Sequence, residues 1–567
     1  MLVGVGKSKV IFNKMHVPMQ GYGNIDHFAD GIENDLFSRA FVFKKENVWL
    51  AIINLECCFT THHLKKAIID GFNLKHSSSM LSIDNVMFCS QNTHSAPGGY
   101  SHYPFFNFST RGFRPSIFAS YKNACIEALS IAYLDIEPSD VFLNVDLIDS
   151  ESDVAFNRSI EAYNSNNDIE YFDDTRTQFA IDRMIKQFRI CSNKSVNKGL
   201  INWFGVKGTS ISEKNSRIHP DNKGYAASLF ENDKSEVRNF VAAFCSESQG
   251  DVSPNYYGRS KWWPRGRYDD EFKSAFFSGF IQFENARNIF DSKDHQIPLK
   301  DSIDFIHYFV DMSKIVCDSE FTNDKKNHET GSPVLGLSFL EGDGIDKPFL
   351  DSVSITLFNS INKYKETLRR IPLITSKKNR IRYQHLKLAH GTKKIFIELQ
   401  DKKILGYSNL NKIPLPNSLK DLGYEIKKQY NSGALKNNTW APIILPIQIF
   451  IIGEIAIVGF PGEISTIAGK RLKKTLLNVL EKRGVIDVII TSNSNEFCGY
   501  TTTYEEYQFQ HYEGSFTLFG QHTLAAFQTV YKQMALKLCE NRENRILPNL
   551  IQPPNFSKEE MDKRTVL

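Results

Sequence analysis

The chain has 567 residues, of which 41% are hydrophobic and 12% aromatic, including 43 phenylalanines. This composition predicts a globular protein with a large core rich in aromatic rings and argues against intrinsic disorder. The 68 Lys and Arg and the 64 Asp and Glu leave a formal net charge of +4. So small an excess argues against nucleic acid as a partner and against membrane adsorption by net charge alone.

The nine cysteines are odd in number and include no Cys-x-x-Cys pair, which is typical of reduced thiols rather than of disulfides or a cysteine zinc site. The first residues show no charged n-region followed by an apolar h-region, so we expect a cytoplasmic protein, with signal-less export as the alternative. The apolar stretch 443–460 contains Pro446 and Glu454, which favours two buried strands over a transmembrane helix.

Patterns along the chain predict a mixed α/β fold. Apolar runs rich in β-branched residues predict strands at residues 36–43, 48–57, 85–90, 141–147, 178–190, 200–206, 240–246, 453–458 and 485–491. Helical spacing predicts helices at residues 60–72, 115–134, 222–232, 271–290, 465–482 and 520–540. Thr60 or Thr61 is a suitable cap for the first helix, and Pro115 opens the second.

Two regions lack a clear pattern. Residues 291–438 show no sustained periodicity, and their basic stretch 363–387 is interpreted as a solvated face rather than a phosphate site. Residues 546–567, with two consecutive prolines, are predicted to form a loose C-terminal tail after a domain that spans residues 1–545.

The strand predicted at residues 85–90 runs into the polar segment Gln91-Asn92-Thr93-His94-Ser95-Ala96-Pro97-Gly98-Gly99-Tyr100. Asn92 and His94 are two residues apart and so point to the same side of an extended chain. Pro97 and the two glycines that follow predict a sharp turn directly after them. In isolation, His94 would most simply satisfy a loop hydrogen bond.

This segment resembles the His-Thr-His-Ser-Gly/Ala-Pro-Gly-Gly motif of the neutral ceramidases, zinc amidases that cleave the N-acyl bond of ceramide. Other motifs of that family follow in the same order, from the start of the chain to about Leu524. They are Asn157-Arg158-Ser159, Trp203-Phe204 with Gly208-Thr209-Ser210, Asp221-Asn222-Lys223-Gly224-Tyr225-Ala226, Gly250-Asp251-Val252-Ser253-Pro254-Asn255, Pro461-Gly462-Glu463 and Tyr504-Glu505-Glu506-Tyr507.

The resemblance implies a catalytic α/β domain followed by an immunoglobulin-like domain. Only about forty residues follow Leu524, too few for such a sandwich, so we expect that domain to be absent. The resemblance also implies ceramide or another N-acyl amide lipid as the partner, with peripheral contact to a membrane as an open alternative.

The family's zinc ligands fall on Asn92, Lys207, Glu463 and Tyr500. An asparagine carbonyl is a weak zinc ligand, and a lysine is protonated near pH 7, so two of the four positions are unsuited to zinc. The resemblance thus implies zinc as the cofactor, while Asn92 and Lys207 predict a weakened or absent zinc site. We expect the Lys207 ammonium to occupy the place of the metal and to bind Glu463 and the Asn92 carbonyl.

Other family positions are retained, and the resemblance implies a role for each. His94 is implied in proton transfer, Arg158 in binding substrate oxygens, and Ser253 lies beside the scissile amide. Tyr500 and Tyr512 are implied in the catalytic pocket, and Gly98, Gly99 and Asp251 in substrate binding. Without the resemblance, Asp251 and Ser253 would more simply cap a turn, and the tyrosines would be core residues.

Three functions fit these residues: a ceramidase-type amide hydrolase with an altered metal site, a pseudoenzyme that keeps the pocket for lipid or protein binding, and a metal-free hydrolase in which Lys207 activates Ser253. In each case we expect Asn92, His94, Lys207, Ser253, Glu463 and Tyr500 to converge on one pocket. We also expect an apolar groove beside Ser253, lined by some of Phe105, Phe106, Phe108, Trp262 and Trp263.

Overall fold

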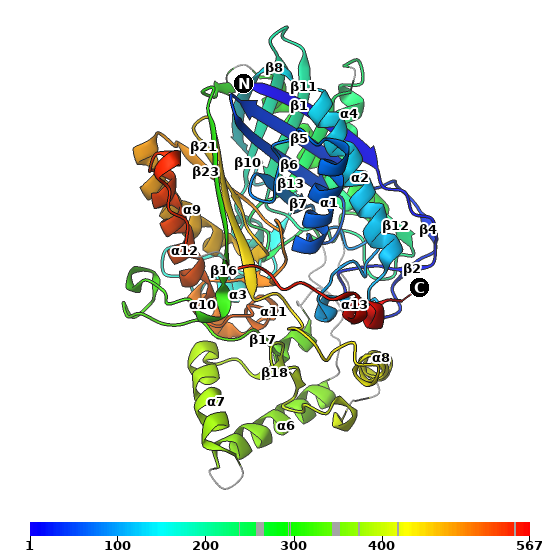
Figure 1. Cartoon of the computed structure of the whole chain (residues 1–567), viewed down its shortest axis with the longest axis vertical. Helices are drawn as coiled ribbons and strands as arrows, with labels where there is room; N and C mark the ends of the chain where they lie inside the picture. The colour runs from blue at the N-terminus through cyan, green and yellow to red at the C-terminus, as the bar shows by residue number, and fades with distance from the viewer. Residues whose placement is uncertain are drawn as a thin grey trace.

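The computed structural model describes residues 1–237, 239–256, 266–292, 294, 296–342, 352–371, 375–414, 416, 419–548 and 551–566. Two sheets pack face to face, and helices cover both outer faces (Figure 1). The described strands of the first sheet have the order β13-β11-β10-β8-β1-β5-β6-β7, with β15 paired to β8. They are β1 (Leu2–Lys9), β5 (Phe37–Lys45), β6 (Val48–Leu55), β7 (Val86–Ser90), β8 (Glu137–Leu147), β10 (Met184–Ser192), β11 (Asn197–Phe204), β13 (Val241–Ser246) and β15 (Gln296–Pro298).

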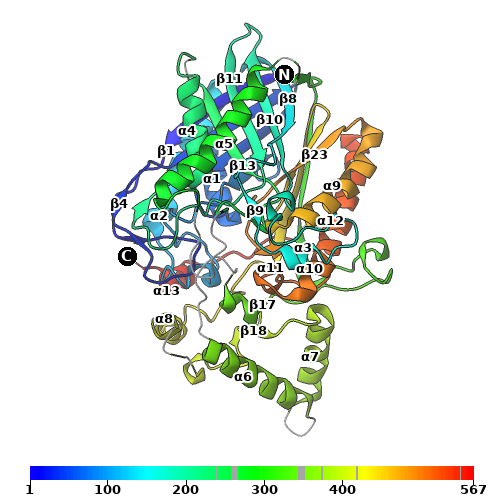
Figure 2. The same ribbon diagram turned by 180° about the vertical axis from the view of Figure 1, so that it is seen from behind.

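The two faces of the first sheet have different partners because side chains alternate along each strand. In β1, Val3 and Val5 join the core between the sheets, whereas Gly4 faces α2 (Pro115–Leu134). A Cβ on Gly4 would lie 2.0 Å from the carbonyl oxygen of Ala132, so the close approach of this helix requires glycine. The same face carries α1 (His62–Lys75), α4 (Asp221–Asp233) and α5 (Glu271–Asp291), as Figure 2 shows from behind.

The second sheet has the order β16 (Ile303–Asp311), β20 (Ile444–Ile452), β21 (Ile455–Gly459) and β23 (Asp487–Thr491) among the described strands. Its outer face is covered by α9 (Thr466–Leu480) and α12 (Thr523–Leu538). β20 and β21 confirm the prediction of two buried strands in residues 443–460. Within the described residues, no helix combines the length and the apolar character needed to span a bilayer.

A smaller unit, which we call the lower lobe, is built from described residues between 334 and 431 and lies at the end of the molecule away from Met1 (Figures 1 and 2). It contains β17 (Val334–Gly336), β18 (Ile395–Glu398), β19 (Lys403–Ile404), α6 (Ser352–Arg370), α7 (Lys377–His390) and α8 (Lys420–Asn431). These elements occupy most of the region for which no secondary structure was predicted.

Short elements fill the junction between the sheets and the lower lobe, and several of them carry the residues of the site. They are β2 (Val17–Pro18), β3 (Phe28–Ala29), β4 (Gly31–Ile32), β9 (Phe156–Asn157), β12 (Arg217–Ile218), β14 (Val252–Ser253), β22 (Glu463–Ile464), β24 (Tyr500–Thr501), α3 (Ile160–Tyr163), α10 (Tyr504–Phe509) and α11 (Tyr512–Ser515).

Most predicted elements are present, with shifted boundaries. Thr61 caps α1 through a bond from the Leu64 amide to its hydroxyl oxygen (3.2 Å), as one of the two predicted caps. β10 begins at Met184 rather than at residue 178, because residues Thr177–Phe179 form a short 3₁₀ helix. That turn is held by bonds between residues three apart, which an apolar pattern alone does not reveal.

The prediction of a loose C-terminal tail is wrong. α13 (Lys558–Arg564) packs onto the domain, and the buried Arg564 guanidinium donates to the carbonyl oxygens of His102 (2.6 Å) and Ala434 (3.0 Å). The Phe113 amide also donates to the Arg564 carbonyl (2.7 Å). These bonds tie together the segment that follows α8, the connection between β7 and α2, and the end of the described chain.

Candidate functional site

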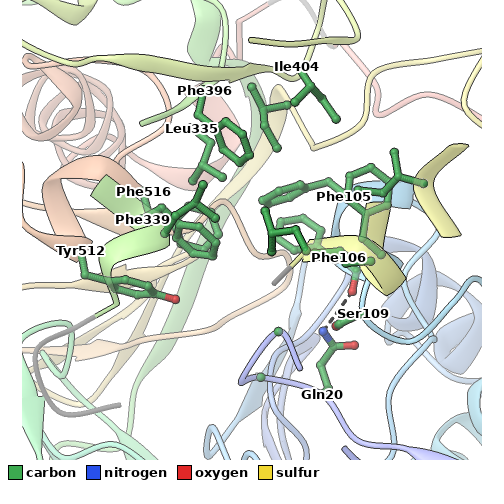
Figure 3. Close-up of a pocket in the computed structure, with 18 of the residues that line it drawn as sticks. Gln20, Phe105, Phe106, Ser109, Leu335, Phe339, Phe396, Ile404, Tyr512 and Phe516 are labelled. Carbon is green, nitrogen blue, oxygen red and sulfur yellow. Dashed lines mark hydrogen bonds between the residues drawn. The ribbon is translucent and has the colours of Figure 1, made fainter. Parts of the chain in front are cut away.

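An aromatic cavity of about 160 Å³ lies between the ends of the sheets and the lower lobe. In Figure 3, Leu335, Phe339 and Phe516 face Phe105 and Phe106 across it. Gln20 donates to the Phe106 carbonyl (3.0 Å) and so fixes one wall. Most of the lining is apolar, and a small polar group that includes His94, Glu463, Tyr500 and Tyr512 also reaches the cavity. Such a lining suits a ligand with a long apolar part and a compact polar part.

The segment after β7 places Asn92 and His94 at this polar group. Asn92 takes a left-handed backbone conformation with φ of 71°, which asparagine tolerates better than most residues. Its side-chain amide donates to the Cys58 carbonyl and to Glu463 Oε1, both at 3.1 Å. Its own Oδ1 is buried and accepts no hydrogen bond from the described residues. The expected bond from Lys207 to this oxygen is therefore not formed.

The loop after β11 brings Lys207 to the same place, where only 1% of its surface is exposed. Its ammonium forms a salt bridge with Glu463 and donates to the Tyr500 hydroxyl oxygen (2.7 Å). It also lies 4.6 Å from the centre of the Tyr500 ring. The predicted contact between Lys207 and Glu463 is thus confirmed, with Tyr500 as a second partner.

Glu463 and Tyr500 are side by side because of backbone pairing. β22 and β24 run parallel, and Glu463 pairs directly with Tyr500. Glu463 follows the Pro461-Gly462 turn, where a Cβ on Gly462 would lie 2.5 Å from the Gly499 carbonyl oxygen. This close crossing explains why glycine precedes the carboxylate. Burial raises the pKa of Tyr500 well above its usual value, so its phenol is neutral at pH 7.

Gly208, next to Lys207, allows the two site loops to cross. A Cβ at this position would lie 2.9 Å from the carbonyl carbon and oxygen of Asn92. We expect Gly208→Ala to destabilise the fold by about 1 to 3 kcal/mol, the usual cost of overpacking. Urea unfolding measures this effect, and the control is Gly31→Ala, where a Cβ would meet no atom nearer than 3.4 Å. Equal effects of both substitutions would contradict the crowding argument.

His94 is held as a neutral imidazole. Burial lowers its pKa to about 3; the bond to the Asn92 carbonyl opposes this shift, and the nearby Lys207 charge adds to it. The ring Nδ1 lies 2.9 Å from that carbonyl oxygen, so Nδ1 carries the hydrogen and Nε2 is left as an acceptor. A Cβ on Gly21 would lie 2.2 Å from the His94 ring, which shows how closely the glycine backbone covers it.

Arg158, which follows β9, reaches the site from the opposite side. Its Nε donates to Glu513 (2.7 Å), and its Nη2 donates to the Tyr500 hydroxyl oxygen (3.4 Å) and the Gly250 carbonyl (3.3 Å). The guanidinium also lies 5.4 Å from the Tyr512 ring centre. Glu513 thus orients the arginine. The sequence analysis missed this residue, although its position directly after Tyr512 could have marked it as part of the site.

Asn92, Lys207 and Arg158 contact the polar group from behind and do not line the cavity, and the remaining predicted residues also lie outside its lining. Asp251 accepts from the Thr466 amide and hydroxyl and from the Asn157 side chain, all at 2.8 Å, so its carboxylate caps α9. Ser253 is buried, and its Oγ accepts from the Asn255 amide (3.2 Å). Gly98 and Gly99 form the turn after His94, and the Gly98 amide donates to the Pro18 carbonyl (2.8 Å).

The predicted groove is present, but its position differs from the expectation. Phe105, Phe106 and Phe108 line the cavity, which extends to Glu463 and Tyr500 rather than to Ser253. Trp262 and Trp263 lie outside the described residues. The opposite wall comes from Leu335, Phe396, Ile404 and α8 of the lower lobe, none of which the sequence analysis identified.

The donor set at the family's metal position does not fit zinc. Lys207 fills the space between Glu463 and Tyr500, and a protonated amine repels a dication. Asn92 turns its amide nitrogen, not its oxygen, toward Glu463. The described residues also contain no group of three or more His, Cys, Asp or Glu side chains arranged to hold a metal ion.

The sequence profile described as "Neutral/alkaline non-lysosomal ceramidase, N-terminal" matches residues 1–403 and 417–529. The chain belongs to this family. It is 27% identical over 541 residues to the neutral ceramidase of Pseudomonas aeruginosa, covering 95% of this chain and 72% of that protein. The neutral ceramidase of Oryza sativa subsp. japonica is 26% identical over 656 residues, with 98% and 77% covered.

Solved ceramidase structures share the fold. The crystal structure of the neutral ceramidase from Pseudomonas aeruginosa superposes with a TM-score of 0.77 at 25% identity, covering 98% of this chain and 76% of that chain. A structure described as ceramidase complexed with C2 gives a TM-score of 0.76 at 26% identity, with 98% and 77% covered. The predicted α/β fold of the neutral ceramidase catalytic type is therefore confirmed.

Proposed function

We propose that this ceramidase-family protein binds a lipid with an N-acyl amide, such as ceramide, with its acyl chain in the aromatic cavity. Family membership supports a function of the ceramide amidohydrolase type. One observation carries the proposal: a hydrogen-bond donor and a hydrogen-bond acceptor, on Tyr500 and His94, both line a largely apolar cavity.

The hydrogen bonds of these two side chains define which atoms are left for a ligand. The Tyr500 oxygen accepts from Lys207 and Arg158, so its own hydrogen is left to donate into the cavity. His94 Nδ1 is used by the Asn92 carbonyl, so Nε2 is left to accept. A secondary amide offers one carbonyl acceptor and one N–H donor, which matches this pair.

We propose further that Lys207 has replaced the metal and that zinc-dependent hydrolysis is not an activity of this chain. An ammonium stabilises the Glu463 carboxylate as a cation would. It has no coordination site for water, however, and so cannot lower the pKa of a water molecule as a metal ion does. The chain would then retain recognition of the N-acyl amide and lack the nucleophile that the metal supplies.

Hydrolysis of the N-acyl amide is the second candidate, and membership in the ceramidase family favours it. Without a metal it would need another nucleophile, and Ser253 with Lys207 as its base is the pair to test. Two contacts weigh against this pair: Ser253 Oγ accepts from the Asn255 amide, and the Lys207 amine is engaged by Glu463 and Tyr500.

A fluorescent N-acyl sphingosine in detergent micelles distinguishes these functions. We expect saturable binding without turnover, unchanged by added zinc or by a chelator. Turnover that a chelator abolishes would contradict the proposed loss of metal chemistry. Turnover that resists the chelator and disappears in Ser253→Ala would support the Ser253 and Lys207 pair. Absence of saturable binding would overturn the proposal itself.

If the acyl chain occupies the cavity, the affinity for the lipid should depend on the free volume of the cavity. Ile426 on α8 lines it, so we expect Ile426→Trp to fill space that the acyl chain needs and to weaken binding of the fluorescent lipid at least tenfold. Each buried CH₂ contributes about 0.8 kcal/mol, so displacing a few accounts for that loss. Ile486→Trp is the matched control, because Ile486 is 53% exposed and does not line the cavity. Equal affinity of both variants would place the lipid elsewhere.

A further inference from the structure

Positive charge is concentrated in α6 and α7, which we call the basic helix pair. Residues 352–390 contain nine Lys or Arg and one acidic residue, a net charge of +8 in a chain whose total is +4. The rest of the chain therefore carries a net negative charge. A local excess of this size creates a positive potential that the overall charge conceals.

Only part of this charge is used in ion pairs. Arg369 pairs with Glu398 (2.5 Å), Lys387 with Glu366 (3.1 Å), and Arg382 with Asp401. Six other basic side chains form no ion pair with the described residues. They are Lys363, Lys365, Arg370, Lys377, Lys378 and Arg380, of which Lys365 lies over the Tyr407 ring.

Large apolar side chains are exposed among these charges. On α6, Leu357 and Tyr364 are 49% and 61% exposed and lie seven residues apart, hence on one face of the helix. On α7, Ile381 and Leu388 are 45% and 74% exposed with the same spacing. Interleaved apolar and basic groups on exposed helices are typical of segments that lie in a membrane interface.

The basic helix pair is also close to the cavity. Phe358, on the buried face of α6, stacks on Phe396 with ring centres 6.1 Å apart, and Phe396 lines the cavity. Another face of α6, roughly 100° around the helix from Phe358, presents Leu357 and Tyr364 to solvent. α6 and α7 form the outer edge of the lower lobe in both views (Figures 1 and 2). A bilayer against this edge would thus be separated from the cavity wall by α6 and its Phe358 side chain.

We propose that the basic helix pair docks the protein on an anionic lipid surface, from which the N-acyl lipid enters the cavity. This inference rests on the proposed function for the identity of the lipid, whereas docking itself depends only on the charges and apolar residues of α6 and α7. Lys363 and Arg370 contact anionic headgroups while Leu357 and Leu388 insert among the outer parts of the acyl chains.

Co-sedimentation of the full chain with vesicles tests the docking. We expect binding to vesicles of phosphatidylcholine containing about one third phosphatidylserine to be at least tenfold stronger than to phosphatidylcholine alone, and to weaken with added salt. The triple variant Lys363→Glu, Arg370→Glu and Lys378→Glu should lose this preference. Leu357→Ser with Leu388→Ser should weaken binding at constant charge. These side chains are exposed, so the fold should be unaffected, and thermal unfolding checks this.

The matched control reverses the same number of exposed charges elsewhere, at Lys14, Lys194 and Lys482. An equal loss of binding in this control would overturn the proposal, because net charge and not the helix pair would then be responsible. Equal binding to both kinds of vesicle, or a stronger preference for duplex DNA than for anionic vesicles, would also overturn it. Binding of the lipid in neutral micelles should be unchanged in the triple variant, so failure of docking is distinguishable from failure of the proposed function.

Discussion

Replacing Lys207 by methionine is expected to lower the free energy of unfolding by about 3 to 5 kcal/mol, the usual loss when one partner of a buried ion pair is removed. Lys207 and Glu463 are 1% and 2% exposed, so water cannot solvate the carboxylate that remains. Glu463 would keep one bond from Asn92 and lose its ion pair. Urea unfolding monitored by tryptophan fluorescence measures the change.

Methionine retains the length of the lysine stem, so this variant tests charge and hydrogen bonding rather than a cavity. The second variant combines Lys207→Met with Glu463→Leu and should be more stable than Lys207→Met alone, because no charged group is left unpaired. Lys66→Ala serves as a control for an exposed pair, since Lys66 and Asp70 are 53% and 60% exposed, and should change stability little. If Lys207→Met behaves like Lys66→Ala, the salt bridge does not stabilise the native state.

The sequence was sufficient to predict the buried ion pair, because family motifs can be assigned to residues of the chain before the fold is known. The resemblance to the neutral ceramidases places Lys207 and Glu463 at two ligand positions of one metal site, and both residues also follow predicted strands. The prediction erred over Asn92, whose amide nitrogen donates to Glu463 while its oxygen is left without a partner among the described residues. Which end of an asparagine faces a neighbour depends on all its neighbours at once, and Cys58 was not among those considered.

Asp251 shows a different limit of sequence analysis. Its motif indicated substrate binding, yet its carboxylate caps α9 through Thr466, which is 215 positions away along the chain. A local pattern identifies a turn-forming aspartate but not the helix that it caps. Ser253, two residues on, likewise has a local partner in Asn255, which was the simpler interpretation.

The lower lobe could not be predicted for a physical reason. β17 and β18 are three and four residues long and pair across a separation of about sixty residues, so neither shows a clear alternation. The apolar residues of this lobe face a cavity, and α6 also exposes Leu357 and Tyr364. α6 is the exception, because its apolar and polar residues alternate at the helical period, so this helix could have been predicted.

Restoring two histidines is expected to create a zinc site where the natural chain has a lysine. The variant Asn92→His with Lys207→His would place two imidazoles beside Glu463 and Tyr500, a donor set that zinc accepts. In the natural chain, Asn92 Nδ2 lies 3.1 Å from Glu463 Oε1, and Lys207 Nζ lies 2.7 Å from the Tyr500 hydroxyl oxygen. Side chains at both positions therefore reach the other two ligands. We expect one zinc per chain by elemental analysis of the variant and none in the natural protein.

The control variants assign the effect to individual ligands. Asn92→His alone should remain without zinc, because the Lys207 ammonium still lies between the carboxylate and the phenol. Adding Glu463→Gln to the double variant should weaken zinc binding by at least about tenfold, since a neutral amide replaces the anionic ligand. Added zinc should raise the unfolding temperature of the double variant alone, because ligand that binds only the native state stabilises it. Stoichiometric zinc in the natural protein, lost on Glu463→Gln, would instead show that Lys207 leaves room for a metal and would overturn the assignment of this lysine as its replacement.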